Sequence, residues 1–97
     1  MEFRNTGSRF EAVDDGQVVG WLEYEPEGDS IAMTHTIVPE QYAGRGIGKR
    51  LTEYAISYAS EHGWTVLPYC TFVQSYLTSH PEYLRLVPAE RRAGFSL

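Results

Sequence analysis

The chain has 97 residues, which suits one domain with a core large enough for one binding site. Its net charge of −5 argues against nucleic-acid binding, because no basic face is available beyond the few cations near Arg45, Lys49 and Arg50. The single cysteine excludes an intrachain disulfide, and no signal peptide or membrane-spanning apolar run is visible. We therefore expect a cytoplasmic protein without nucleic-acid or membrane partners, present as a monomer or a weak homodimer.

The first part of the chain predicts an antiparallel β-meander. Residues 9–13 alternate polar and apolar side chains, residues 14–16 supply hairpin-turn chemistry, and residues 17–24 form the returning strand. A second turn at residues 26–29 leads into a third strand over residues 30–38. This third strand ends where a glycine-rich segment begins.

The second part predicts a β-loop-α-β-α arrangement. A helix from about residue 46 to residue 62 carries one apolar face and ends before Gly63, a suitable C-cap. Residues 64–68 form a short buried strand, and a crossover helix of this length favours a parallel pair with a right-handed connection. A second helix follows and ends near His80 and Pro81.

The fold class expected from this order of elements is α/β (α+β), with an antiparallel meander followed by a parallel strand pair. We expect one domain over residues 1–97, with a core over about residues 8–87. The tail, residues 88–97, has no clear element, so it is expected to be partly mobile or to pack on a partner.

Three glycines, Gly44, Gly46 and Gly48, stand between the third strand and the first helix. Glycine lets backbone N–H groups approach a ligand closely, and the dipole at a helix N-terminus favours an anion, so the expected ligand carries phosphate. The spacing excludes two common phosphate loops. Lys49 stands where a dinucleotide fingerprint needs glycine, and Arg50 stands where a Walker loop needs Ser or Thr.

The glycine-rich segment resembles the acetyl-CoA pyrophosphate loop of the GNAT superfamily of N-acetyltransferases. The pattern of that loop, Gln/Arg-x-x-Gly-x-Gly/Ala, is met by Gln41, Gly44 and Gly46. The resemblance extends from about Ser8 to Tyr83 and is nearest to the small, single-domain GNAT-like proteins. The further matches, in chain order, are His35-Thr36, Pro68-Tyr69-Cys70 and His80-Pro81-Glu82-Tyr83.

The resemblance implies a truncated GNAT-like fold with acetyl-CoA as co-substrate. Pantetheine would enter a gap between two splayed parallel strands, here between residues 37–38 and residues 66–67, with the strand pairing broken near Pro68. The residues implied in binding acetyl-CoA are Ile37, Val38, Gln41, Gly44, Arg45, Gly46, Ile47, Gly48 and Lys49.

Four of these residues have an alternative explanation. Gln41 could cap the loop internally, and Gly48 could serve only close helix packing. Arg45 and Lys49 could be solvated side chains, although a cation in the first turn opposes the helix dipole and a bound phosphate would remove that conflict.

The thioester would point toward His35 and Cys70, the two catalytic candidates. Cys70 is either a small buried hydrophobe or a nucleophile that takes the acetyl group, helped by His35 or by the N-terminus of the next helix. In direct transfer, His35 would remove the amine proton and a strand N–H such as that of Val38 would polarise the carbonyl. The three histidines are too scattered for a metal site, so we expect none.

The function expected first is transfer of an acetyl group from acetyl-CoA to an amine, with protein or peptide amines among the candidates. The short turn at residues 14–16 leaves no room for the helices that wall the acceptor pocket in larger GNAT domains. An open site could also be completed by a partner subunit or lack an efficient acceptor. The alternatives are a non-catalytic CoA-binding module and an interaction domain in which the loop is only a turn.

Overall fold

The computed structural model describes every residue from Met1 to Leu97. Its elements, in chain order, are β1 (Glu2–Asn5), β2 (Arg9–Asp14), β3 (Gln17–Glu27), β4 (Ser30–Ile37), η1 (Glu40–Tyr42), α1 (Ile47–Glu61), β5 (Thr65–Pro68), α2 (Thr71–Ser79), η2 (Pro81–Leu86) and η3 (Ala89–Phe95), where η marks a 3-10 helix. None of the helices combines the length and the apolar character that a membrane span requires.

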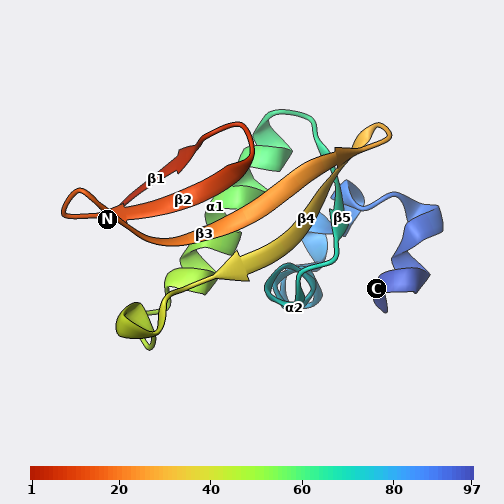
Figure 1. Ribbon diagram of the computed structural model, residues 1–97. Coiled ribbons are helices and arrows are strands. Elements are labelled where there is room, and N and C mark those ends of the chain that lie inside the picture. Colours follow the sequence, from red (N-terminus) through yellow and green to blue (C-terminus); the bar gives the residue numbers. More distant parts are fainter.

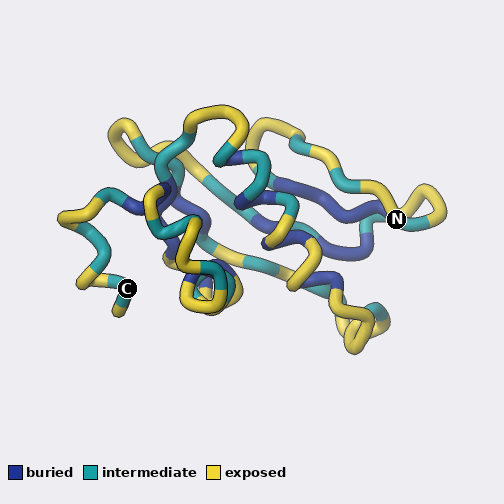
Figure 2. Tube along the Cα trace, turned by 180° about the vertical axis from the view of Figure 1, so that it is seen from behind, coloured by how far each residue is buried: buried dark blue, intermediate teal, exposed yellow.

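A single five-stranded sheet holds the strands in the order β1-β2-β3-β4-β5 (Figure 1). Neighbours from β1 to β4 run antiparallel, whereas β5 runs parallel to β4. Helix α1 connects β4 to β5 and covers one face of the sheet, which Figure 2 shows from the helix side. The predicted α+β class, with a meander followed by a parallel pair, is confirmed.

Two strands differ from the sequence expectation. β1 was not predicted, because its four residues are too few to show a period, and it forms as an edge strand by pairing with β2. β3 continues through Pro26, where a turn was expected, and Pro26 pairs with Ile31 of β4. Proline is tolerated there because β2 has already ended opposite Glu23, so no neighbour requires the missing N–H.

The hydrophobic core lies between the sheet and the two helices. Sixteen buried residues form one cluster, drawn from β2, β3, β4, α1, β5, α2 and the segment after α2. Helix α1 approaches β3 most closely at Gly20, where an added Cβ would lie 2.9 Å from Ile47 Cγ2 and 3.3 Å from Leu51 Cδ1. The absence of a side chain at Gly20 therefore allows the N-terminal half of α1 to pack closely on the sheet.

The C-terminal tail contains an element that the sequence did not predict. The 3-10 helix η3 follows Pro88, and the Nε of Arg92 donates a hydrogen bond to the carbonyl of Val87 at 3.1 Å. In both views the tail lies beyond β5, at the end of the molecule away from β1 (Figure 1, Figure 2).

Candidate functional site

A groove opens where β4 and β5 part. Their parallel pairing runs from Ser30 opposite Thr65 to Met33 opposite Pro68, and the N–H of Cys70 then donates to the carbonyl of Met33 at 3.0 Å. Beyond this point β5 has ended, so the rest of β4 has no strand partner on that side. The ladder ends at Pro68, where the sequence predicted the break.

The position of the gap corrects one expectation. Val66 and Leu67 do not face residues 37–38, because they pair with Ile31 and Ala32. On its other side β4 pairs with β3, and a register shift there leaves Thr34 without a pairing partner, since Glu23 pairs with His35 and Tyr24 with Met33. The gap therefore separates the second half of β4 from residues 69–72.

The groove has a volume of about 370 Å³. Its lining comes from two consecutive stretches of chain, namely Thr34, His35, Thr36 and Ile37 on one side and Tyr69, Cys70, Thr71 and Phe72 on the other. The molecule has four large apolar side chains that are exposed, and three of them, Ile37, Tyr69 and Phe72, line this groove. Exposed apolar walls beside a free strand edge suit a long, narrow ligand with amide groups.

Cys70 lies at the inner side of the groove. It is the N-cap residue of α2, its side chain is buried, and its Sγ lies 3.0 Å from the hydroxyl oxygen of Thr36. The N-terminus of α2 is the helix end that the sequence suggested as a stabiliser of a thiolate. In the sequence, Thr36 is only part of the His35-Thr36 motif. Its contact with Cys70 results from the register of β4.

His35 lines the same groove, but its side chain lies on the face of β4 opposite to that of Thr36. Consecutive strand residues point to opposite faces. Its side chain is 71% exposed, and its Nδ1 lies 3.6 Å from Oε1 of Glu23 on β3. No hydrogen bond joins His35 to Cys70. The two catalytic candidates thus share a groove without touching each other.

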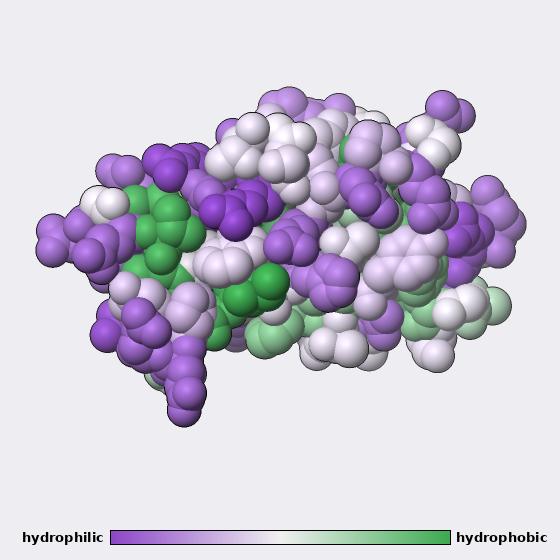
Figure 3. Space-filling model, viewed as in Figure 1, coloured by the Kyte–Doolittle hydropathy of each residue, from purple (hydrophilic) through white to green (hydrophobic).

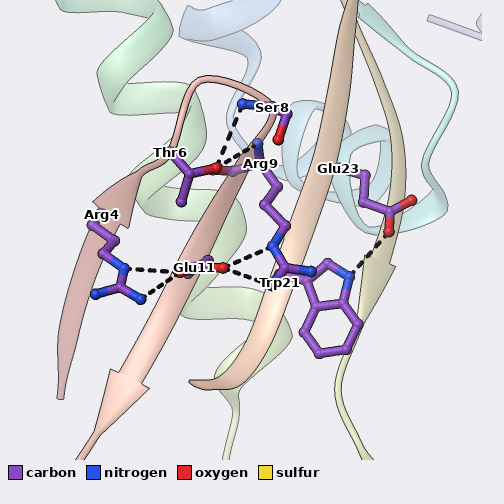
Figure 4. A network of polar contacts seen from close by, with 7 residues as sticks. All are labelled: Arg4, Thr6, Ser8, Arg9, Glu11, Trp21 and Glu23. Carbon is purple, nitrogen blue, oxygen red and sulfur yellow. Dashed lines mark hydrogen bonds and ion pairs between the residues drawn. The ribbon is translucent and has the colours of Figure 1, made fainter. Parts of the chain in front are cut away.

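A polar network leads across the open face of the sheet to the carboxylate beside His35 (Figure 4). Glu23 accepts a hydrogen bond from the indole N–H of Trp21 at 3.1 Å, and the guanidinium of Arg9 lies 4.7 Å from the Trp21 ring centroid. Arg9 also donates to the buried carboxylate of Glu11 at 2.7 Å. Figure 3 shows that this face is mainly hydrophilic, with separate apolar patches.

The glycine-rich loop leads from β4 to the N-terminus of α1. Gly44 and Gly46 have φ angles of +82° and +71°, and nothing lies within 4 Å of a Cβ added at either position. Both glycines are therefore required by the backbone conformation and not by crowding. Gly46 is the N-cap of α1 and no side chain caps this end, so the first-turn N–H groups are free to meet an anion.

The sequence profile of the GCN5-related N-acetyltransferases matches residues 9–86. The chain belongs to this family. Protein NATD1 of Mus musculus and of Homo sapiens are each 38% identical to this chain over 71 residues, covering 69% of it and 64% and 63% of their own length. The chain thus spans less than two thirds of these relatives. A solution structure of a GCN5-like protein from Staphylococcus aureus has a TM-score of 0.65 over 90% of this chain and 87% of that one, at 21% identity, which supports the fold.

Two residues expected in the family's acetyl-CoA loop are engaged elsewhere. The side chain of Ile47 is 2% exposed and belongs to the core, so only its backbone can contact a ligand. A Cβ on Gly48 would lie 2.6 Å from the ring of Phe72, so this glycine serves the close packing of α1 against α2. Packing was the alternative considered for Gly48 from the sequence.

The polar candidates of the loop remain accessible. Gln41 lies in η1 and is exposed, without a hydrogen bond from its side chain, and Arg45 stacks over the ring of Tyr42 at 5.5 Å. Lys49 lines a second groove of about 310 Å³ between α1 and α2. None of the four ion pairs involves Arg45 or Lys49, so both cations are available to an anion.

Tyr76 and His80 also line the groove between α1 and α2. Burial is the main cause that raises the pKa of Tyr76, and its ring stacks on that of His80 with the centroids 4.0 Å apart. The Nδ1 of His80 lies 3.0 Å from the carbonyl oxygen of Tyr76, one turn back. This arrangement fits a helix C-terminus, where the last carbonyls need partners.

Proposed function

We propose that this protein is an N-acetyltransferase that carries an acetyl group from acetyl-CoA to an amine. The observation that supports this most is the nearness of the uncapped N-terminus of α1 to the groove that ends at Cys70, since Phe72 lines that groove and lies against Gly48 in the first turn of α1. In a member of the GCN5-related family, one ligand with a phosphate end and a thioester end would occupy both. The pyrophosphate would lie on the first-turn N–H groups, including those of Ile47 and Gly48.

The shape and polarity of the groove support a position for the rest of acetyl-CoA. The pantetheine amides would bond to the free edge of β4 near Ile37 and Val38, as an added strand would. Arg45 and Lys49 would add charge near the phosphates, because neither has an acidic partner. The acetyl group would then lie beside Cys70, in the groove between the second half of β4 and residues 69–72.

Two chemical routes are compatible with this arrangement. In direct transfer the amine nitrogen attacks the thioester carbon, His35 accepts the amine proton through water, and the carbon–sulfur bond breaks to release the CoA thiolate, which is then protonated. In the covalent route the Cys70 thiolate attacks first, CoA leaves, and the amine then displaces the Cys70 sulfur. In this route Cys70 would act from the N-terminus of α2, with its Sγ 3.0 Å from the Thr36 hydroxyl oxygen.

The first experiment is isothermal titration of the protein with acetyl-CoA, desulfo-CoA and ATP. Binding of both CoA species without binding of ATP would support the loop and groove as one CoA site. If neither CoA species binds, the transferase is excluded together with the CoA-binding module. With binding established, loss of acetyl transfer in Cys70→Ala favours the covalent route, and loss only in His35→Ala favours direct transfer.

The second candidate function is a CoA-binding module without turnover. It is favoured by the exposure of the acceptor side, where the His35 side chain is 71% exposed and no helix covers the sheet. A panel of small amines, peptides with free N-termini and lysine-containing peptides tests it. Undiminished CoA binding with no acetylated product from any of these amines would favour the module.

A further inference from the structure

The C-terminal helix η3 packs back onto the rim of the groove at Tyr69. The guanidinium of Arg91 lies 3.3 Å from Glu27 Oε2 through Nη1 and 3.1 Å from the Tyr69 hydroxyl through Nη2. The ring of Phe95 meets the ring of Tyr69 edge-on, with centroids 5.1 Å apart. Three segments that are distant in the sequence therefore converge on one tyrosine.

Tyr69 is fixed by these contacts and not by the core. Its hydroxyl lies 2.9 and 3.1 Å from the two carboxylate oxygens of Glu27, at the end of β3, and receives the hydrogen bond from Arg91. The residue is 43% exposed and lies in the short connection between β5 and α2. An exposed ring in such a position would sample several rotamers if its hydroxyl and its edge were not held.

The held ring stands at the acceptor side of the groove. Tyr69 precedes Cys70 directly and lines the same groove, and Glu27, which anchors it, projects from the sheet face that α1 does not cover. His35 borders the groove from β4 on that same face. An amine that approached a thioester beside Cys70 from this face would meet both His35 and Tyr69, since both line the groove.

We propose that Tyr69, held by Arg91 and Phe95 of η3, is the residue that sets acceptor size, and that it selects a primary amine on an unbranched chain. This inference rests on the proposed function, because it takes the groove as the site of the thioester. The groove of about 370 Å³ would also hold the end of pantetheine, so the volume left beside Tyr69 favours an acceptor that is not branched next to its amine. The tail thus supplies a wall that no helix between the first strands provides.

The test uses Cys70, the only cysteine, as a reporter of access, so it does not depend on acetyl transfer. The rates of alkylation by iodoacetamide and by the bulkier N-phenylmaleimide are measured by mass spectrometry in the full chain. In Tyr69→Ala the alkylation rate with N-phenylmaleimide, divided by the rate with iodoacetamide, should rise about tenfold. This corresponds to about 1.4 kcal/mol in the activation barrier. Arg91→Ala and Phe95→Ala should raise this ratio by a smaller factor, because the ring remains but is no longer held.

The control is Arg85→Ala, which removes an arginine bonded to Ser60 on α1 and should leave the ratio unchanged. An unchanged ratio in Tyr69→Ala would overturn the proposal. A raised ratio in Tyr69→Ala with wild-type ratios in both Arg91→Ala and Phe95→Ala would overturn the role of η3. Melting temperatures are recorded for each variant, so that a general loosening of the fold is recognised.

A second arm measures substrate choice once transfer is observed. Wild-type protein should acetylate n-butylamine with a higher kcat/KM than tert-butylamine, and Tyr69→Ala should bring the two values together without weakening the binding of acetyl-CoA. If no amine is acetylated while the alkylation ratio still changes, the transferase proposal fails and the structural role of Tyr69 stands. If both amines keep their wild-type ratio in Tyr69→Ala, the size-selection proposal fails.

Discussion

At the residue scale, Glu11 shows how a charge is accommodated inside a small protein. Its side chain is 6% exposed, on the sheet face away from α1, and it forms ion pairs with Arg4 at 2.8 Å and with Arg9 at 2.7 Å (Figure 4). The alternating pattern of β2 predicts that Glu11 faces away from the core, which is correct. The burial arises from its two arginine partners, one on the unpredicted strand β1.

We expect Glu11→Gln to lower the free energy of unfolding at neutral pH by about 1–3 kcal/mol, because two charge-assisted hydrogen bonds are weakened and two arginines lose their counter-charge. Urea unfolding of the two proteins measures the difference. Glu25→Gln is the control, since this exposed glutamate on the neighbouring strand has no ion pair. A loss of equal size in both variants would refute a special role for Glu11.

The same residue predicts a pH dependence. The hydrogen bond from Arg4 is the main cause that holds the pKa of Glu11 below its ordinary value of 4.5. A lowered folded-state pKa means that the stabilisation is fully present above about pH 4.5 and is lost as the pH falls through the folded value. The difference between wild type and Glu11→Gln should therefore shrink in unfolding experiments below pH 4.5. A difference that stays constant down to acid unfolding would contradict this account.

At the element scale, the close packing of α1 on the sheet depends on Gly20. We expect Gly20→Ala to destabilise the protein by about 1–3 kcal/mol, because its Cβ would crowd atoms of α1 and β4. Those atoms are Ile47 Cγ2 at 2.9 Å and the Ile37 carbonyl oxygen at 3.3 Å, and the carbonyl cannot move without disturbing β4. Chemical denaturation measures the loss.

The matched control is Gly94→Ala in η3, where an added Cβ would meet nothing within 4 Å and φ is not positive. This substitution should be neutral or slightly stabilising, since alanine reduces the freedom of the unfolded chain. Equal destabilisation by both substitutions would mean that the loss at Gly20 reflects the strand position and not the contact with α1. The shared contact also couples α1, which carries the loop, to the end of β4, which borders the groove.

At the scale of the whole molecule, a bound CoA should stabilise the fold by mass action. At a concentration about 100 times its Kd, acetyl-CoA would add about 2.7 kcal/mol to the free energy of unfolding. For a chain of this length that corresponds to a rise in melting temperature of roughly 10 °C or more, since each kcal/mol shifts it by about 4–8 °C. Thermal unfolding with and without ligand measures this, and ATP should give no rise.

Two glycine variants make this prediction specific. Gly46→Glu should abolish the acetyl-CoA-induced rise, because it introduces a negative side chain at the N-terminus of α1. Gly28→Glu is the control, since Gly28 also has a positive φ, +60°, and open space around its Cβ, but lies in the turn between β3 and β4. Both variants carry similar backbone strain, so an equal ligand-induced rise in the two would refute the loop as the phosphate site.

The sequence by itself determined the local elements and the candidate phosphate loop. Alternation and turn residues predicted β2, β3 and β4, helical spacing predicted α1, and Gly44 and Gly46 stand where the backbone has positive φ. These features follow from neighbours along the chain, since periodicity and glycine conformation are local properties. Family membership follows from the same motifs and from the match over residues 9–86.

Only the tertiary structure decided which residues meet across the fold. The register of β5 against β4 moved the gap to residues 69–72, the packing of α1 buried the Ile47 side chain and brought Gly48 against Phe72, and the tail reached Tyr69. A change of strand register by one residue reverses which side chains face the groove. Such a change does not alter the local composition, so the composition cannot predict the register. Contacts between residues 27, 69 and 91 depend on the path of the whole chain, which the sequence pattern does not specify.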